Sequence, residues 1–408
     1  MAVSVINALN LIRENTNIVD TEIIKIEDAS NRISAQKIIA IYPLPRFDNS
    51  AMDGYAVLSN DSGEDVRVIG KILAGDDQDI LIEDKTAIKI MTGARVPSNT
   101  TAIVPQEDIE ILNDNTIRLP QNIKELQHIK YIGEDVALND LIINIHDEIN
   151  FGIISLLASQ GITDIEVYRK PKIAVFASGE ELRPHFEEIE AHQIYNSNSP
   201  SLIARVKELG CDVEFIGSAR DNLESLKDHV QRSLDFDLII TSGGVSVGEA
   251  DFTKEAFESF DMEYIFNGII IKPGKPTVFG KINNALVLNL PGNPFASQII
   301  FEMFGTSIIQ NLKGDKNTYH KMIVAKINDD LKNKKGRITL IPGNFDGEHF
   351  TPSIKRGPGM VSVLSACDSF IVLDENVSIL KKDTRVDVIQ IKNKRFIEKN
   401  KDFLTYAK

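Results

Sequence analysis

Positive charge and cysteine are both scarce in this chain of 408 residues. Its 59 acidic side chains outnumber its 45 lysines and arginines, which gives a formal net charge of −14. Bulk attraction to nucleic acid or to an anionic membrane is therefore disfavoured. A small anionic ligand is not excluded, because basic side chains can gather in one cleft.

The two cysteines, Cys211 and Cys367, lie far apart, and neither belongs to a CxxC pair. The sequence thus indicates neither a zinc site nor a disulfide framework. We expect both to be small apolar side chains in a protein of a reducing compartment.

Long hydrophobic runs are also missing. No stretch approaches about 18 consecutive apolar residues, so we expect no membrane span. The start, MAVSVINALNLIRENTN, lacks a basic segment followed by a long apolar core and does not resemble a signal peptide. Its apolar positions fit one face of a helix instead. We expect a cytoplasmic protein, and the length predicts two to four domains.

The pattern of residues changes along the chain and predicts an α/β multidomain protein. Short helical patterns occur near the N-terminus, the second of them over Ile26–Ala40, and return with Phe151–Gly161 as the clearest stretch. Short strands and turns are indicated between them, and alternating runs near the C-terminus indicate a small β-domain. We expect four domains: a helical linker and dimerisation domain (1–40 and 136–168), a β-rich domain (41–135), a central α/β domain (169–313) and a C-terminal β-domain (314–408).

The central region alternates strand, turn and helix, which calls for a mostly parallel sheet with helices on both faces. We expect helices over Pro200–Leu209, with Ser199 as the cap, over Asn222–Leu234 and around Phe295–Leu312. The expected strands are Ile173–Ala177, Val213–Ile216, Leu238–Ile240 and Ala285–Leu290.

Four expected strand ends carry small or acidic residues, and ligands of parallel sheets bind beyond such ends. The sequences there are Ser178-Gly179-Glu180-Glu181, Arg220-Asp221, Ser242 through Asp251, and Gly292-Asn293. Glycines let backbone N–H groups approach a phosphate. Gly243-Gly244 alone would be better explained as a tight turn, but four such ends favour a phosphate or nucleotide site.

The charged residues near these ends allow two interpretations. Each acid, including Glu249, can be a solvated helix start, where carboxylates are favoured. Clustered carboxylates beside a phosphate instead favour Mg²⁺ as a partner. Lys272 and Lys275 lie in IIKPGKPTVFG. They are either exposed residues of a surface hairpin or ligands that present ammonium groups to an oxyanion.

The combination of motifs strongly resembles the molybdopterin molybdenumtransferase family, which includes MoeA and the E domain of gephyrin. The motifs are SGGVSVGEAD (242–251), KPGKP (272–276), NLPGNP (289–294), PRFDNSAMDGYAV (45–57), MTGARVP (91–97) and GED (133–135), in register over essentially the whole chain. The resemblance implies an elongated homodimer that inserts molybdenum from molybdate into adenylylated molybdopterin and releases AMP, with Mg²⁺ required. It also implies transient contact with the adenylyltransferase that acts before it.

The resemblance also implies residue roles. Catalytic positions are Asp53, Thr92, Asp135, Glu181, Asp221, Asp251, Lys272 and Lys275; Asp251 and Glu181 would hold Mg²⁺. Substrate-binding positions are Ser178, Gly179, Ser242, Gly243, Gly244, Ser246, Pro291, Gly292, Asn293 and Pro294. The cleft is implied to lie between the α/β domain of one subunit and Asp53, Thr92 and Asp135 of the other.

Some positions depart from the family pattern. Gly268, Ile132 and Pro342 stand where the family usually has basic residues, and Pro358 stands where it often has serine. Lys130 and Arg337 keep other basic positions, while Lys355 and Arg356 are candidates to compensate. A non-catalytic molybdopterin carrier or scaffold and a molybdopterin adenylyltransferase are the alternative functions, although the early DNSAMDGYA motif argues against the latter.

Overall fold

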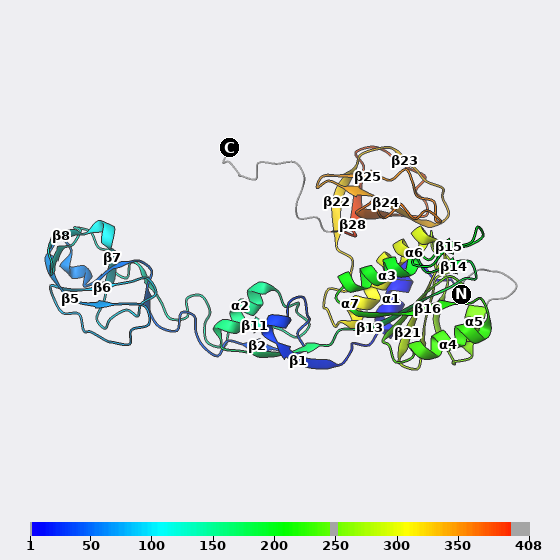
Figure 1. Ribbon diagram of the computed structural model, residues 1–408. Helices are drawn as coiled ribbons and strands as arrows, with labels where there is room; N and C mark the ends of the chain where they lie inside the picture. Colours follow the sequence, from blue (N-terminus) through cyan, green and yellow to red (C-terminus); the bar gives the residue numbers. More distant parts are fainter. Residues whose placement is uncertain (1, 245–251, 393–408) are drawn as a thin grey trace.

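The chain folds into an elongated molecule whose two ends carry different kinds of sheet (Figure 1). The computed structural model describes residues 2–244 and 252–392. At one end lies an all-β arm, and at the other lies an α/β body with the C-terminal sheet beside it, while a slender connector joins the two ends. Within the described residues, no helix is both long and apolar enough to cross a bilayer.

The body is built on a six-stranded sheet whose first four strands are parallel, which confirms the predicted mostly parallel α/β fold. The last two strands run antiparallel to their neighbours. In spatial order the strands are β16 (Asp212–Ala219), β13 (Lys172–Ser178), β17 (Leu238–Ser242), β21 (Ala285–Leu290), β20 (Val278–Ile282) and β18 (Glu263–Asn267).

The central strands are apolar on both faces because helices cover both faces. Ile173 and Val175 point into one core, with α1 (Val5–Asn15), α3 (Asn198–Glu208), α6 (Pro294–Ile300) and α7 (Thr306–Leu312). Ala174 and Phe176 point into the other, with α4 (Leu223–Ser233) and α5 (Phe252–Glu258).

Two helices of the body differ from the sequence prediction in how they begin or continue. The prediction that Ser199 caps its helix is wrong. Helix α3 begins at Asn198 after Ser197, and the Ser199 backbone N–H donates to the Asn196 side chain. The single helix expected over 295–312 is interrupted by a π-helical turn, Phe301–Gly305. In this turn Glu302 is held by Arg205 of α3, with Nε–Oε1 and Nη2–Oε2 distances of 2.8 and 3.0 Å.

The connector consists of paired strands and one helix. Antiparallel pairs join β1 (Thr21–Lys25) to β12 (Asp164–Tyr168) and β2 (Ile38–Ile39) to β11 (Leu141–Ile143), and α2 (Phe151–Ser159) packs over them. The prediction of a helix over Ile26–Ala40 is wrong, because the only helical segment there is a 3₁₀ turn, Ile26–Asp28. Asn31 has φ 61°, a left-handed conformation that a right-handed helix cannot continue through.

The arm is a second six-stranded sheet. Its order is β7 (Ala102–Pro105), β4 (Gly54–Val57), β6 (Thr86–Ile90), β5 (Asp65–Ile72), β9 (Thr116–Arg118) and β8 (Glu110–Asn113). A short pair, β3 (Asn49–Ser50) with β10 (Ile129–Lys130), closes its base, and single 3₁₀ turns span Ser59–Asp61 and Gln106–Asp108.

The C-terminal sheet takes one strand from the body. Its own strands are β24 (Ile338–Phe345), β25 (His349–Pro352), β22 (Met322–Ile327), β28 (Arg385–Gln390) and β26 (Ser369–Leu373), and a separate pair joins β23 (Leu331–Lys332) to β27 (Ile379–Leu380). The body strand β19 (Ile271–Lys272) adds to β24 in parallel, with Ile271 opposite Ile338 and Lys272 opposite Thr339. This pairing connects the KPGKP segment directly to the C-terminal sheet.

Both cysteines are free and buried in the main core, as small apolar side chains would be. Burial raises the pKa of the Cys211 thiol to about 12, so it stays protonated and unreactive near neutral pH.

We predict that Arg205→Met destabilises the protein by about 3 kcal/mol, because it leaves the Glu302 carboxylate buried without its partner. Burial already raises the pKa of Glu302 above its usual range, and Arg205 opposes that rise. Loss of Arg205 raises the pKa further, so the folded state of the variant binds more protons than the unfolded chain. Its stability should therefore decrease as pH rises.

Urea unfolding followed by circular dichroism at about pH 5 and about pH 8 measures this difference. The double variant Arg205→Met/Glu302→Leu is the control, and it should recover most of the lost stability. A single variant as stable as the parent at both pH values would contradict this role of the ion pair.

Candidate active site

A cavity of about 1150 Å³ lies at the carboxyl ends of the parallel strands in the body. All four strand ends singled out by sequence contribute to its wall: Ser178, Gly179 and Glu181 after β13, Asp221 after β16, Ser242, Gly243 and Gly244 at β17, and Pro291, Gly292, Asn293 and Pro294 after β21. We call this space the strand-end cavity.

Glycine is required where the loops of this cavity meet. Gly243 has φ +97°, and a Cβ on it would lie 2.4 Å from the Ser178 carbonyl oxygen. Gly244 has φ +67°, and its Cβ would lie 1.9 Å from Thr253 Oγ1. A side chain at either position would push the loops apart. The glycines thus let the end of β17 pack against the end of β13 and against α5, with their backbone exposed to the cavity.

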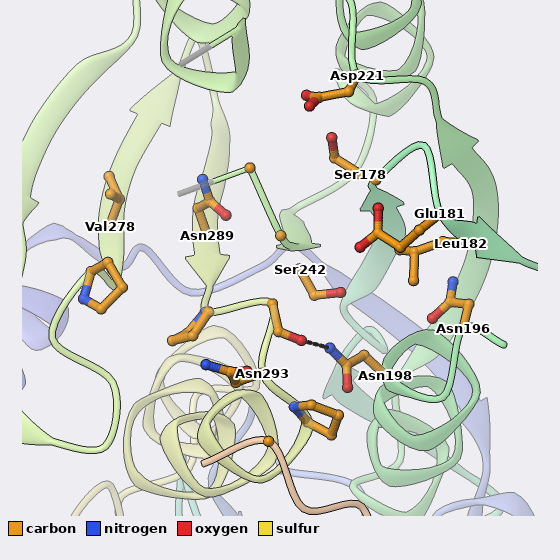
Figure 2. A pocket seen from close by; sticks show the side chains of 18 of the residues that line it. Ser178, Glu181, Leu182, Asn196, Asn198, Asp221, Ser242, Val278, Asn289 and Asn293 are labelled. Atoms are coloured by element: carbon orange, nitrogen blue, oxygen red, sulfur yellow. Dashed lines mark hydrogen bonds between the residues drawn. The ribbon is translucent and has the colours of Figure 1, made fainter. Parts of the chain in front are cut away.

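Two carboxylates face the strand-end cavity. Figure 2 shows Glu181 and Asp221 on the same side as Ser178, whose buried hydroxyl has no hydrogen-bond partner among the described residues. The predicted residues Ser246 and Asp251, and with them Glu249, lie outside the described residues. Within the described ranges no three His, Cys, Asp or Glu side chains cluster as a metal site.

Several residues of this wall were missed from the sequence. Asn198 donates from Nδ2 to the Gly292 carbonyl at 2.8 Å and so ties the start of α3 to the loop after β21 (Figure 2). Asn289 also lines the cavity, and its Oδ1 accepts a hydrogen bond from Thr241 Oγ1 on the neighbouring strand at 2.6 Å. The signals available were the YNSNS segment at 195–199, whose asparagines are also typical of helix caps, and the NLPGNP motif, which begins with Asn289.

A second cavity, of about 510 Å³, lies on the other side of the same loops. It adjoins the first because Lys275, Pro276, Pro291 and Asn293 belong to both walls. Its basic lining residues are Lys272, Lys275, Lys332, Lys334, Arg337 and Arg356, and its wall contains no acidic residue in the described part of the chain. We call it the basic cavity.

The turn that carries Lys272 and Lys275 is held by close packing. Gly274 has φ +110°, and a Cβ there would lie 2.2 Å from Cδ1 of Ile300 in α6. Lys272 ends β19, which belongs to the C-terminal sheet, while Lys275 reaches both cavities. The structure therefore brings both predicted lysines to one cavity, and not to an ordinary surface hairpin.

Asp53 directly precedes β4 and Thr92 follows β6, so both belong to the arm, which lies at the opposite end of the molecule from the α/β body (Figure 1). Asp53 and Thr92 are together: Asp53 Oδ1 accepts from the Thr92 backbone N–H and hydroxyl, both at 2.7 Å. The Thr92 backbone hydrogen bond, followed by the hydroxyl, lowers the pKa of Asp53. Asp135 lies apart, where its N–H donates to the Leu44 carbonyl.

Three family models together match most of the chain. Residues 3–161 match the MoeA N-terminal region (domain I and II), residues 174–311 match a probable molybdopterin binding domain, and residues 324–391 match the MoeA C-terminal region (domain IV).

Whole-length relatives agree with these matches. A molybdopterin molybdenumtransferase of Haemophilus influenzae is 37% identical, covering 87% of this chain and 90% of its own length. One from Staphylococcus epidermidis is 33% identical over 92% of both chains. A crystal structure of the MoeA protein of Pyrococcus horikoshii has a TM-score of 0.83 at 29% identity, over 96% of this chain and 100% of its own. The chain therefore belongs to the MoeA family of molybdopterin molybdenumtransferases.

Proposed function

We propose that this protein inserts molybdenum from molybdate into adenylylated molybdopterin and releases AMP. The observation that carries the proposal is the shared wall of the two cavities, which places a site for a small anion beside a site for a larger phosphorylated ligand. The names of the relatives supply the reaction, and the adjoining cavities supply places for its two substrates.

The strand-end cavity suits the adenylylated pterin. Its volume exceeds the roughly 300–1,000 Å³ of common small-ligand sites, which fits a substrate that joins two heterocycles through a pyrophosphate. Backbone exposed by Gly243, Gly244 and Gly292 can approach phosphate oxygens closely. We assign Ser178, Gly179, Ser242 and the 291–294 turn to the same binding role, together with Ser246 outside the described residues.

A Mg²⁺ ion fits the carboxylates of this cavity. Mg²⁺ is commonly held by one or two carboxylates together with substrate phosphates, and Glu181 and Asp221 already face the space where phosphates would lie. We propose that Glu181 and Asp251 hold it, with Asp221 close by. When bound, the ion supplies charge neutralisation at the phosphoanhydride from which AMP leaves.

The basic cavity suits molybdate. Lys272 and Lys275 offset its two negative charges, and Lys275 stands where the anion would meet the pterin. Molybdate held here would lie next to the two dithiolene sulfurs of the pterin substrate, which are to bind the metal. Both reactants are then fixed in one site, and no encounter in solution is needed.

A second subunit would complete the site. We propose a homodimer in which Asp53, Thr92 and Asp135 of one chain reach the strand-end cavity of the other chain, since within one chain the arm lies at the opposite end from the α/β body (Figure 1). In this arrangement the chain acts as four domains: the connector (1–40 and 136–168), the arm (41–135), the α/β domain (169–313) and the C-terminal domain (314–408). A substrate delivered by the preceding adenylyltransferase would enter this cleft.

Purified protein supplied with adenylylated molybdopterin, Mg²⁺ and molybdate should release AMP, and AMP release should depend on molybdate. Chromatographic quantification of AMP, with and without molybdate, measures this. Tight binding of the pterin without AMP release would instead support a carrier or scaffold, and formation of the adenylylated pterin from ATP would support an adenylyltransferase.

Lys272→Ala should raise the molybdate concentration needed for half-maximal AMP release by about tenfold or more, because one charged hydrogen-bond donor is lost. The rate at saturating molybdate should change less. Lys335→Ala is the matched control, since this exposed lysine lies near the basic cavity in sequence but does not line it. An unchanged half-maximal concentration in the Lys272 variant would remove this lysine from molybdate binding.

Mixing two inactive variants tests the shared site. Asp53→Ala alters only the arm contribution, and Asp221→Ala alters only the α/β contribution. Random re-pairing gives half of the dimers one variant of each kind, and each such dimer has one intact site out of two. The mixture should therefore regain about one quarter of the parent rate of AMP release. Activity that stays at the level of the separate variants after subunit exchange would place both residues in the same chain's site.

A further inference from the structure

The basic cavity concentrates positive charge in a chain that is acidic as a whole. Six basic residues line it, in a chain whose net charge is −14. None of the six side chains forms a salt bridge or hydrogen bond with a described residue. Like charges gathered around one space repel each other, and an anion between them removes that cost. The cavity is therefore built for an anion.

Most of this charge comes from the C-terminal region. Lys272 and Lys275 come from the body, whereas Lys332, Lys334, Arg337 and Arg356 come from beyond β22. Two backbone contacts hold the halves together at the cavity: β19 pairs with β24, and the Ala296 N–H donates to the Pro358 carbonyl at 3.2 Å. An anion in the cavity would thus contact both sides of the junction between the body and the C-terminal sheet.

Arg356 differs from the other five because part of its charged group is buried. Its Nη1 is inaccessible to solvent and has no hydrogen-bond partner in the described parts of the chain. A buried charged donor without an acceptor costs free energy, and such groups normally have a partner. The planar guanidinium can offer two parallel N–H groups to an oxyanion, which a lysine cannot do. Arg356 is therefore the member of the group best suited to orient an anion.

Two prolines of the C-terminal region, Pro342 and Pro358, provide no hydrogen-bond donor to the basic cavity. Pro342 lies in β24 opposite Phe370 and does not line the cavity. Pro358 does line it but has no N–H or hydroxyl to donate. The hydrogen-bond donors on the C-terminal side of the cavity must therefore come from residues other than these two prolines.

We propose that Arg356, supported by Lys332 and Lys334, is the oxyanion ligand that the C-terminal region contributes, and that it selects a tetrahedral dianion. Identification of that dianion as molybdate rests on the proposed function. A phosphate group of the nucleotide substrate shares this chemistry. We favour the free oxyanion, because no aromatic side chain among the described residues lines the basic cavity to hold a heterocycle.

The test measures binding of molybdate alone to the full chain by isothermal titration calorimetry, without pterin. Arg356→Gln should weaken binding about tenfold or more, since a charge-assisted hydrogen bond is lost, and Arg356→Lys should weaken it less. Lys355→Gln is the matched control, because this lysine is adjacent and exposed but does not line the cavity. The affinity of this variant for molybdate should stay within about twofold of that of the parent.

Three outcomes would overturn this assignment: molybdate affinity of Arg356→Gln equal to that of the parent, an equal loss in Lys355→Gln, or no saturable molybdate binding by the parent. Stronger binding of AMP or pyrophosphate than of molybdate, weakened by Arg356→Gln, would also overturn it in favour of a nucleotide phosphate. AMP release is measured separately. A parent that releases AMP in response to molybdate while Arg356→Gln binds molybdate normally would leave the proposed function intact and reject only the role of Arg356.

Thermal unfolding gives a second reading that does not depend on weak calorimetric heats. At matched ionic strength, molybdate should raise the melting temperature of the parent and of Lys355→Gln more than that of Arg356→Gln, because a ligand stabilises the state that binds it. Equal shifts in all three proteins would contradict the proposal.

Discussion

The wall between the two cavities is the constraint on which the rest of the site depends. It consists of two turns, Lys272–Pro276 and Pro291–Pro294, and parts of both face each cavity. Glycines let both turns pack closely against their neighbours: Gly274 leaves no room for a Cβ against Ile300, and a Cβ on Gly292 would already contact Gly243. A thicker wall would separate an anion in the basic cavity from a ligand at the strand ends. The geometry therefore links packing at a few glycines to the proximity that the proposed reaction needs.

The same wall joins two domains with different tasks. The parallel sheet supplies strand ends, acids and glycines, as parallel sheets commonly do at their ligand-binding edge. The C-terminal sheet supplies charge, and it is held in place because β19 of the body completes its edge. The arm contributes Asp53. Hydrogen bonds from Thr92 lower the pKa of its carboxyl group, so this carboxylate stays ionised at neutral pH. In the proposed dimer these three contributions meet in one cleft, which explains why a chain of this length is drawn out and not compact (Figure 1).

Much of the body and of its ligand-binding edge could be predicted from sequence, because buried parallel strands are short apolar runs followed by small residues. Ala285–Leu290 forms a strand with the bounds expected, and the four strand ends surround one cavity. The failures have physical causes. Ile26–Ala40 has helical spacing of apolar residues, but a left-handed Asn31 and strand pairing override it. Asn198 was not singled out, because only tertiary packing ties it to Gly292. Arg356 was named from sequence only as a candidate to compensate for missing basic residues, because the burial of its Nη1 also depends on tertiary packing.

Crystals of the protein grown with tungstate, a heavier tetrahedral dianion, and with AMP would test the central claim most directly. Anomalous scattering locates tungsten without ambiguity. The account predicts a tungsten peak in the basic cavity, in contact with the side chains of Lys275 and Arg356, and AMP in the strand-end cavity on the other side of Asn293. Tungsten bound only at a site remote from the Lys272–Pro276 turn, with the basic cavity holding solvent, would contradict it.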